Sequence, residues 1–407
     1  MHVVVVNIHF APFTYGGATI VAEEVAKALV ARHDVTVSAI STICREDLEP
    51  YAVMRTTSEG FDSYLINIPA KCSFENTYSN VALNAAITRL WGRLSPDVVH
   101  VHCVQRIGAD VVRLAKEAGY KTVLSVHDYW WLCERQFMVR TDGAYCDQDA
   151  IDLSVCAHCV PNIRKTQKRQ AHLFKAMAAA DLITFPSQHA RDLHVASGLR
   201  ALADKMVIWH NGVRLPEAAF FVQQKARRDA DKRVVFGFVG GPSQLKGWPL
   251  IRDAFAGLGR DDFRGLLVDG GDVASWWPSE RRAELWQLKG DWSIVEKYSQ
   301  DTMDGFYAQI DVLLFMSQWK ETFGLTIREA LSRGIRVIQT DSGGTTEHPA
   351  LDADRLIPIG ASAERLQQEI TACLEADLSH PIAGIESYSD QADNLMAWLS
   401  EPERSEA

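Results

Sequence analysis

The fold is decided by residues 312–334, VLLFMSQWKETFGLTIREALSRG. The opening run of apolar residues predicts a buried strand, and the spacing of apolar residues after Gly324 predicts a helix. A short polar loop containing Glu321 stands between them. In open parallel sheets, ligands bind beyond the carboxyl ends of the strands, where such loops lie. The stretch therefore predicts a strand–loop–helix unit of an α/β fold, with a site in the loop.

The same alternation continues outward in both directions. In the first half we expect strands at 3–8, 35–40, 64–68, 98–102, 122–126, 182–185 and 206–209, and helices at 19–31, 107–118 and 165–180. In the second half we expect strands at 234–239, 266–268, 293–295, 312–315, 337–340 and 356–358, and helices at 248–256, 279–288, 325–332 and 363–374. Near-continuous apolar strands separated by helices are typical of parallel sheets covered on both faces.

The chain turns polar and charged over residues 215–232, which we interpret as the connection between two halves. We therefore predict two Rossmann-like, doubly wound domains facing a central cleft. The first covers residues 1–214, with the C-terminal helix of residues 386–407 packing back on it. The second covers residues 233–385.

Composition narrows the functional classes. The chain has 407 residues, 47% of them hydrophobic, and a formal net charge of −10. An acidic chain does not suit a nucleic-acid binder, which needs a basic footprint. The opening residues MHVVVVNIHF resemble a first strand more than a signal peptide, and the sequence contains no apolar stretch of the ~18 residues that a membrane span needs. We expect a cytoplasmic protein.

The loop after the strand at 312–315 is the strongest candidate site. Unpaired amides of Gly324, Leu325 and Thr326 at a helix start would form an anion site suited to a diphosphate. The carboxylate of Glu321 is suited to accepting hydrogen bonds from sugar hydroxyls, and that of Glu329 from both ribose hydroxyls. Alone, either glutamate would be read as a helix-end charge or half of a surface pair. Their spacing, the intervening Phe323-Gly324 and the preceding strand favour the binding role.

These residues resemble the E-x7-E region of the retaining GT-B glycosyltransferases of family 4, or glycosyl transferases group 1. The resemblance implies that Glu321 contacts the donor sugar and Glu329 the nucleoside ribose. It also implies that the backbone at Gly324 and Leu325 holds the diphosphate, with Phe323 and Thr326 beside it. The reaction implied is transfer of a hexosyl group with retention of anomeric configuration.

Two glycine-rich turns extend the resemblance. In FVGGPSQLKGW, residues 238–248, Gly240 and Gly241 let the backbone approach phosphate, and Lys246 supplies positive charge. Similar enzymes commonly have an arginine at the position of Gly241, so part of the usual phosphate clamp is either missing or comes from elsewhere, with Arg252 and Arg333 as candidate substitutes. In TYGGAT, Gly16 and Gly17 resemble the family's N-terminal glycine loop, although a simple tight turn explains them equally well.

The segment SVHDYWWLC, residues 125–133, places His127 at a strand end. The family has a histidine there that contacts the donor sugar, so we expect a catalytic role for His127 beside Glu321 and Lys246. Asp128 and Tyr129 are candidates for the acceptor side.

Four cysteines, Cys133, Cys146, Cys156 and Cys159, lie within 27 residues in a polar, irregular segment. A structural zinc site would stabilise such a loop. Four reduced thiols, or two disulfides in an oxidising compartment, are the alternatives. No Asp-x-Asp signature stands at a strand end, so we expect glycosyl transfer that needs no metal cofactor.

The expected partners are a nucleotide-sugar, UDP- or GDP-linked, and a glycan or lipid-linked glycan acceptor in polysaccharide biosynthesis. A basic stretch at 164–175 permits peripheral contact with an anionic membrane at the inner face of the cell membrane, although a solvated helix face explains it too. Two alternatives stay open. One is a nucleotide-sugar epimerase or sugar-phosphate synthase on the same fold, and the other is a catalytically degenerate GT-B scaffold protein.

Overall fold

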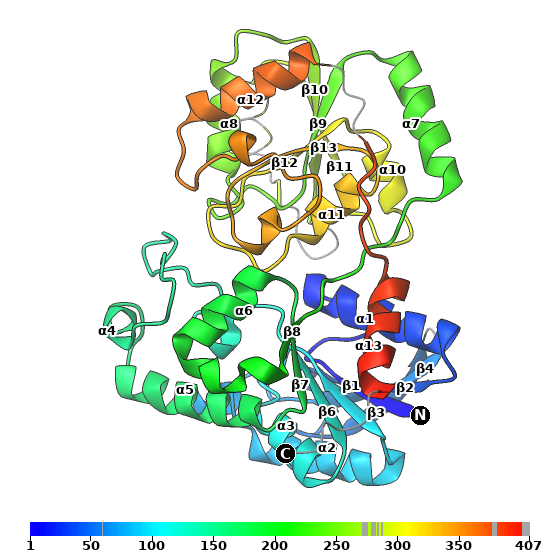
Figure 1. The fold of residues 1–407 in the computed structure, drawn as a ribbon, viewed down its shortest axis with the longest axis vertical. Helices are drawn as coiled ribbons and strands as arrows, with labels where there is room; N and C mark the ends of the chain where they lie inside the picture. The colour runs from blue at the N-terminus through cyan, green and yellow to red at the C-terminus, as the bar shows by residue number, and fades with distance from the viewer. Residues whose placement is uncertain are drawn as a thin grey trace. The chain divides into compact units, whose positions relative to one another are not determined.

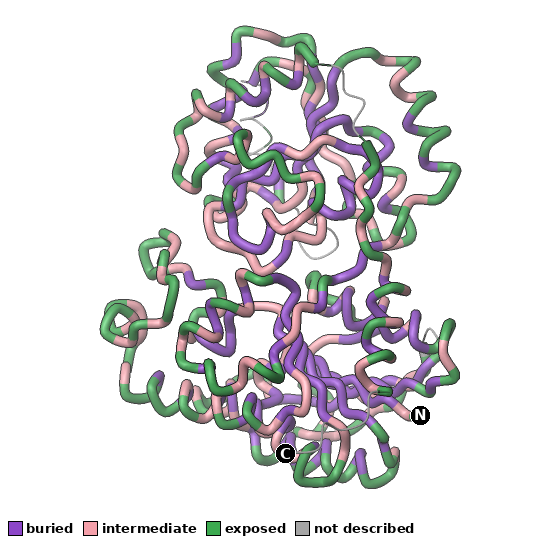
Figure 2. Tube along the Cα trace, in the orientation of Figure 1, coloured by how far each residue is buried: buried purple, intermediate pink, exposed green. Residues whose placement is uncertain are grey.

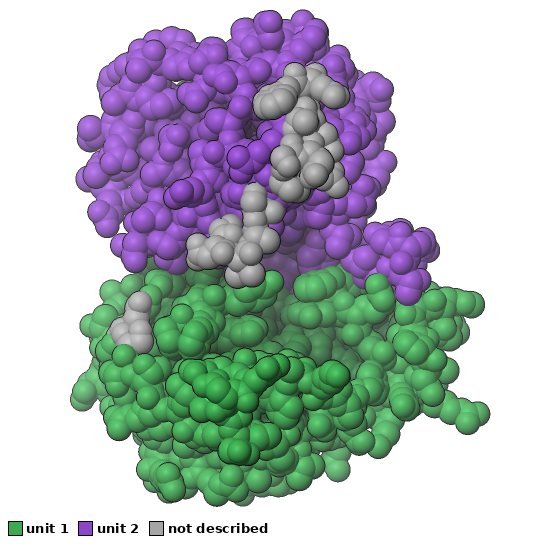
Figure 3. Space-filling view, turned by 180° about the vertical axis from the view of Figure 1, so that it is seen from behind, with its two compact units in different colours: residues 1–138, 147–212, 386–407 green, residues 139–146, 213–385 purple. Residues whose placement is uncertain are grey.

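The computed structural model describes residues 1–58, 60–270, 276–277, 282, 285, 288–376 and 381–400. The chain forms two compact units (Figure 3). Unit 1 comprises residues 1–138, 147–212 and 386–407, and unit 2 comprises residues 139–146 and 213–385. Each unit is built on a largely parallel sheet with helices around it, which confirms the predicted α/β class with two Rossmann-like domains.

Unit 1 holds an eight-stranded sheet in the order β3-β4-β2-β1-β5-β6-β7-β8. Its strands are β1 His2–Val6, β2 Thr36–Ile43, β3 Val53–Ser58, β4 Phe61–Asn67, β5 Val98–Val101, β6 Lys121–Ser125, β7 Leu182–Phe185 and β8 Met206–Ile208. All neighbours are parallel except β3 and β4. The sequence analysis missed β3, because its residues VMRTTS have no continuous apolar run and belong to an edge strand.

The helices of unit 1 are α1 Gly17–Arg32, α2 Val81–Leu94, α3 Asp110–Glu117, α4 Leu153–Cys156, α5 Ile163–Ala178, α6 Gln188–His194 and α13 Tyr388–Ser400. The central strands between them are buried (Figure 2). The four valines of β1 are each at most 2% exposed, so each contributes about 1.5 kcal/mol or more of hydrophobic stabilisation. These buried strands form the rigid base that positions the strand-end loops.

The last helix, α13, belongs to unit 1 although it follows unit 2 in the sequence (Figure 1). It packs against α1, where Arg32 forms an ion pair with Asp393 at 2.6 Å. Gln391 accepts hydrogen bonds from Trp209 Nε1 at 3.0 Å and from the Gly212 amide at 2.8 Å. These contacts tie the end of the chain to the segment that follows β8.

Unit 2 holds a five-stranded parallel sheet in the order β11-β10-β9-β12-β13. Its strands are β9 Val234–Phe238, β10 Phe263–Val268, β11 Asp291–Val295, β12 Val312–Phe315 and β13 Arg336–Gln339. Its helices include α7 Ala218–Ala230, α8 Trp248–Gly257, α10 Met303–Tyr307, α11 Leu325–Leu331 and α12 Ala363–Glu375. The core beneath α8 is aromatic, with Phe236, Phe255 and Phe263 in contact at ring-centroid distances of 5.1–5.9 Å.

The polar stretch at 215–232 is a helix of unit 2 and not an open connection. Phe220 of α7 is buried in the core of unit 2. Arg227 and Arg228 bind the buried carboxylate of Asp311 at 2.6 and 2.8 Å, and the Val235 amide donates to the same carboxylate at 3.0 Å. The charges that suggested a solvated linker therefore neutralise a buried acid, and the longer segment of unit 2 begins at residue 213.

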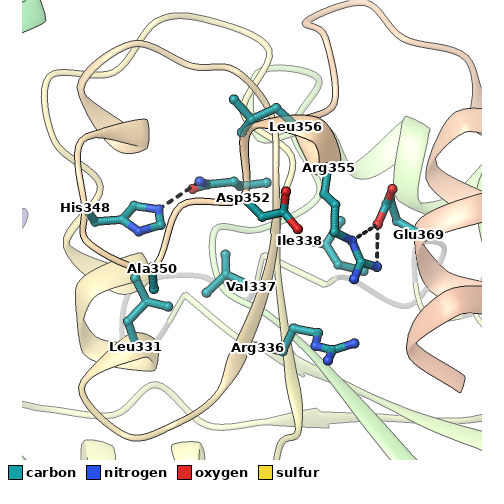
Figure 4. A pocket seen from close by; sticks show the side chains of 11 residues that line it. Leu331, Arg336, Val337, Ile338, His348, Ala350, Asp352, Arg355, Leu356 and Glu369 are labelled. Atoms are coloured by element: carbon teal, nitrogen blue, oxygen red, sulfur yellow. Dashed lines mark hydrogen bonds and ion pairs between the residues drawn. The ribbon is translucent and has the colours of Figure 1, made fainter. Parts of the chain in front are cut away.

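The predicted strand at 356–358 is wrong. This segment meets the sheet through a single parallel bridge between Thr340 and Ile357. A cavity of about 180 Å³ lies beside β13 and is lined by residues of that strand, of the loop that follows it and of α12 (Figure 4). None of the predicted site residues lines this cavity. The predicted helix at 279–288 falls mostly outside the described residues.

Candidate functional site

An ion pair between Lys246 and Glu321 forms the centre of the candidate site in unit 2. Lys246 Nζ donates to Glu321 Oε1 at 2.8 Å, and the Ser317 hydroxyl donates to the same oxygen at 2.8 Å. Glu321 Oε2 has no donor among the described residues. The loops that carry the two charges follow β9 and β12, which are neighbours in the sheet. One carboxylate oxygen is thus fixed and the other is available to a hydroxyl group.

Glycines shape the loop that presents Lys246. A Cβ atom at Gly240 would lie 3.1 Å from Lys246 Cγ, so the lysine stem packs on this glycine. Gly247 has a φ of 76°, and a Cβ atom there would lie 2.0 Å from the carbonyl oxygen of Met316. This close approach brings the loop against the end of β12, where Glu321 follows.

Gly241 has a structural reason to lack the arginine that similar enzymes commonly have. Its φ is +70°, and a Cβ atom would lie 2.9 Å from the ring of Trp276. A larger residue would need both a strained backbone and displacement of that ring. Neither candidate substitute supplies an uncompensated charge, because Arg252 pairs with Asp253 at 2.8 Å and Arg333 with Asp304 at 2.6 Å.

The start of α11 has the form that the sequence predicted. Gly324 precedes the helix in the left-handed conformation, with φ 82° and ψ 72°, and no side chain caps the helix. Within the described part of the chain, the amides of Gly324, Leu325 and Thr326 donate to no other group. Three amide donors at a helix start have the geometry that the sequence analysis expects of an anion site.

The loop that follows β13 is hydrogen-bonded to the loop that follows β12. The Glu321 amide donates to the carbonyl of Ser342 at 2.9 Å, and the Gly344 amide donates back to the carbonyl of Glu321 at 3.0 Å. The loops after β12 and β13 are therefore held together at Glu321, which fixes the backbone that carries its carboxylate.

Arg328 was not identified by the sequence analysis. Its side chain is 2% exposed and lies over the ring of Phe323 at 4.1 Å. Its guanidinium donates to the carbonyls of Phe323, Thr345, Gly344 and Glu347. Burial lowers the pKa of this guanidinium to about 9. One signal in the sequence could have indicated its burial: within TIREAL the arginine occupies a helical position at which an apolar residue is expected.

Glu329 lies in the interior of unit 2, at 4% exposure. The hydroxyl of Tyr307 donates to its Oε2 atom at 2.7 Å, and burial raises the pKa of the carboxyl. Arg333, behind it, donates to the Glu329 carbonyl at 3.0 Å. The two carboxylate oxygens of Glu329 offer about four acceptor sites, so acceptor capacity remains for a ribose hydroxyl beside the bond from Tyr307.

In unit 1, Gly16 and Gly17 stand at the start of α1, where Gly16 has a φ of 80°. The adjoining loop is anchored by Glu23 of α1, whose two oxygens accept from the hydroxyl of Thr14 at 2.8 and 2.9 Å. Burial is the main cause that raises the pKa of Glu23 to about 7. The glycine loop is therefore held by a carboxyl group that titrates near neutral pH.

His127 follows β6 and belongs to a chain of three histidines. His127 Nε2 and His102 Nδ1 are 2.8 Å apart, and the rings of His102 and His100 have centroids 4.1 Å apart. His100 Nε2 in turn contacts the Ser125 hydroxyl at 2.7 Å. Burial lowers the pKa of His127 to about 4 and of His100 to about 3. The chain is therefore neutral at physiological pH, and the hydrogen bond between His102 and His127 couples the proton positions on the two rings.

Asp128 and Tyr129 serve local structure. Asp128 accepts from the Trp130 amide at 2.8 Å and from the side chains of Gln136 at 2.6 Å and Gln105 at 3.2 Å. Tyr129 is fully buried, with its ring 6.5 Å from that of His194. Its position in the core gives the acceptor role no support.

The four predicted zinc ligands lie in α4 and in the segments before and after it. Cys133, Cys156 and Cys159 belong to unit 1, whereas Cys146 is assigned to unit 2. Across the described residues, no group of three or more histidine, cysteine, aspartate or glutamate side chains is placed to hold a metal ion. The zinc site stays a prediction.

The basic stretch at 164–175 lies on α5, and part of it is structural. Arg169 is 2% exposed, donates to the Trp130 carbonyl at 2.5 Å and lies 4.8 Å over the Trp130 ring. Lys168 pairs with Glu75 at 3.0 Å. In the described part of the chain, no helix has both the length and the apolar character needed to cross a membrane.

Comparisons with known proteins agree with this organisation. Residues 15–216 match the model of Glycosyltransferase Family 4, and residues 221–386 match that of Glycosyl transferases group 1. An uncharacterized 42.6 kDa protein in the cps region of Klebsiella pneumoniae is 23% identical over 374 residues, which cover 85% of this chain and 87% of that protein.

Solved structures share the fold at low sequence identity. Sucrose-phosphate synthase from Thermosynechococcus elongatus aligns with a TM-score of 0.66 at 16% identity, covering 98% of each chain. HepE from Anabaena, in complex with UDP, gives 0.63 at 15% identity over 98% of this chain and 95% of that one. A glycosyltransferase from Rickettsia africae gives 0.64 at 17% identity over 98% and 99%.

The fold and the two matched family models together define a glycosyltransferase of the GT-B class. The chain belongs to glycosyltransferase family 4, whose C-terminal part is the group 1 domain.

Proposed function

We propose that this protein transfers a sugar from a nucleotide-sugar donor to an acceptor hydroxyl, with retention of anomeric configuration. The observation that carries the proposal is the Lys246–Glu321 pair beside three amides that have no partner within the described residues. Positive charge and amide donors suit the negative charge that develops on a departing diphosphate. A carboxylate oxygen without a donor suits a sugar hydroxyl.

Each part of the donor has a proposed partner. The backbone at Gly324, Leu325 and Thr326, with Phe323 beside it and Lys246, binds the diphosphate. Glu321 binds the sugar and Glu329 the ribose. Since lysine and amides supply the positive charge, the proposed transfer uses no divalent metal. Retention would follow from attack on the same face of the sugar, assisted by the leaving phosphate.

In unit 1, we assign the remaining roles to two strand-end elements. Neutral His127 donates or accepts a hydrogen bond at the donor sugar, and the loop of Gly16 and Gly17 contributes its backbone to the donor. A neutral imidazole suits hydroxyl recognition because it has one donor and one acceptor nitrogen.

The donor nucleotide that we favour is UDP. HepE from Anabaena has been solved with UDP, with UDP and glucose, and with UDP-glucose. The relative from the cps region of Klebsiella pneumoniae supports an acceptor in polysaccharide biosynthesis, such as a glycan or lipid-linked glycan. We propose a cytoplasmic protein that contacts the inner face of the membrane through the exposed basic residues of α5.

The test is turnover of a panel of UDP-, GDP- and ADP-sugars, with release of nucleoside diphosphate measured with and without a lipid-linked glycan fraction. Transfer requires a donor and an acceptor, and the anomeric proton coupling of the product reports retention. Conversion of the donor alone into a second nucleotide-sugar would instead identify an epimerase. Full activity in EDTA is expected.

A further inference from the structure

At Gly241 the proposed diphosphate site lacks the cation that similar enzymes commonly place there. Of the buried arginines in unit 2, one differs from Arg333 and Arg227 because it forms no ion pair among the described residues. Arg333 pairs with Asp304, and Arg227 pairs with Asp311. Arg328 has no carboxylate partner in the described residues. Its printed hydrogen bonds all go to backbone carbonyl oxygens.

Arg328 is hydrogen-bonded to the turn that carries the amides of Gly324, Leu325 and Thr326. Helical side chains point toward the amino end of their helix, and the guanidinium reaches back to the carbonyl of Phe323, directly before Gly324. Its other three acceptors belong to the loop after β13. One side chain thus joins the turn that carries the three amides to the loop that holds the backbone of Glu321.

The charge of Arg328 is the second observation. The guanidinium of Arg328 is hydrogen-bonded only to backbone carbonyl oxygens and forms no ion pair among the described residues, so its positive charge is not neutralised by direct contact with a carboxylate. The carboxylate of Glu347 acts on Arg328 through space and raises its pKa, but only the backbone carbonyl of Glu347 accepts a hydrogen bond from the guanidinium. Burial weakens dielectric and ionic screening, so this charge acts on an anion bound at the neighbouring turn.

We propose that Arg328 is a positioning residue for the diphosphate, which compensates from inside the protein for the cation missing at Gly241. This inference rests on the proposed function. Arg328 fixes the amides of Gly324, Leu325 and Thr326 by hydrogen bonds and favours an anion at those amides by its charge, without touching the ligand.

The test compares Arg328→Gln, which is neutral but keeps amide donors for the carbonyls, with Arg328→Lys, which keeps the charge. Calorimetric titrations use pyrophosphate, UDP and uridine as probes. We expect Arg328→Gln to weaken pyrophosphate and UDP binding at least about tenfold and uridine binding less than about twofold. Arg328→Lys should restore most of the pyrophosphate affinity.

Arg333→Gln is the matched control, because Arg333 is equally buried near the end of the same helix but is neutralised by Asp304. If the loss of a buried arginine only disturbs the structure, Arg333→Gln should weaken the binding of UDP and of uridine to the same extent. Should Arg328→Gln fail to fold, as judged by circular dichroism, Arg328→Lys at 50 and 500 mM salt replaces it. Its pyrophosphate affinity should stay within about threefold of wild type at both salt concentrations.

The outcomes separate this inference from the proposed function. Equal losses for UDP and uridine in Arg328→Gln, unchanged pyrophosphate affinity in that variant, or a tenfold loss in Arg328→Lys would overturn the role of Arg328 alone. Failure of wild-type protein to bind pyrophosphate and UDP would overturn the diphosphate site itself.

Discussion

The loops at the carboxyl ends of the two sheets carry polarity in different ways. In unit 2 the groups are charged. Lys246 and Glu321 form an ion pair, and Arg328 is buried on α11, where it contacts the loop that follows β13. In unit 1 the groups are histidines whose pKa values are lowered by burial, so they are neutral. The difference matches the proposed function, in which unit 2 binds the anionic part of a donor and unit 1 binds hydroxyl groups.

The largest effect is expected from substitutions of the charged residues in unit 2. Lys246→Ala or Glu321→Gln should lower turnover of a donor sugar by about 10²–10³-fold, because each removes a group proposed to act where charge develops. Initial rates of UDP release from the donor selected by the panel measure the effect. Lys320→Ala is the control, since this neighbouring lysine pairs with Asp341 at 3.4 Å and not with Glu321. Equal losses in all three variants would contradict the assignment.

The next prediction concerns how Lys246 is placed. Gly247→Ala should lower the free energy of unfolding of unit 2 by about 1–3 kcal/mol, because the new Cβ atom would collide with the Met316 carbonyl at a positive φ. Turnover should fall as well, as the Lys246 loop moves away from Glu321. Urea unfolding followed by tryptophan fluorescence measures the stability. Gly259→Ala, with no atom within 4 Å of the added Cβ, should match wild type.

The neutral side is tested through His102. His102→Leu removes the partner of His127 Nε2 and should lower turnover about tenfold, which corresponds to one buried hydrogen bond. His102→Gln, which keeps a hydrogen-bonding group, should recover part of the rate. His194→Leu replaces another buried histidine of unit 1, whose pKa is also lowered to about 4, and should retain normal turnover. A loss in His194→Leu as large as in His102→Leu would reduce the histidine chain to a packing role.

The smallest effect is expected at the glycine loop of unit 1. Burial raises the pKa of Glu23 from its ordinary value of 4.5 to about 7, so the folded protein binds a proton there that the unfolded chain releases. The stabilising contribution is therefore complete below pH 4.5 and is lost as pH rises through about 7. Thermal unfolding of wild type and Glu23→Gln between pH 5 and 8 checks this. The difference between the two proteins should change with pH in that direction, and a constant difference would contradict it.

Sequence alone predicted the charged site better than the neutral one. Glu321 and Gly324 lie in one contiguous stretch, and Lys246 follows a glycine-rich turn, so spacing was sufficient to place them in strand-end loops and at a helix start. His102 and His127 come from different strand ends, and they meet because β5 and β6 pair in the register Val101↔Leu124. The periodicity of the sequence does not indicate which residues of β5 and β6 pair with one another.

The remaining differences also have tertiary causes. The hydrogen bonds of Arg328 depend on the loop that follows β13, whose position relative to the helix is set by the tertiary fold. The polar residues of α7 suggested a linker, because the acid that neutralises Arg227 and Arg228, Asp311, lies more than 80 residues away. The strand expected at 356–358 has the right composition, but it meets β13 at one bridge only.

The central claim is that the loop of Lys246 and the start of α11 bind the diphosphate of a nucleotide-sugar. The most direct test is the unfolding temperature of wild type, Lys246→Ala and Lys320→Ala in rising concentrations of UDP and of GDP. The account predicts that one of the two nucleotides raises the unfolding temperature of wild type and Lys320→Ala, with little effect on Lys246→Ala. Equal stabilisation of Lys246→Ala, or no stabilisation of wild type by either nucleotide, would contradict it.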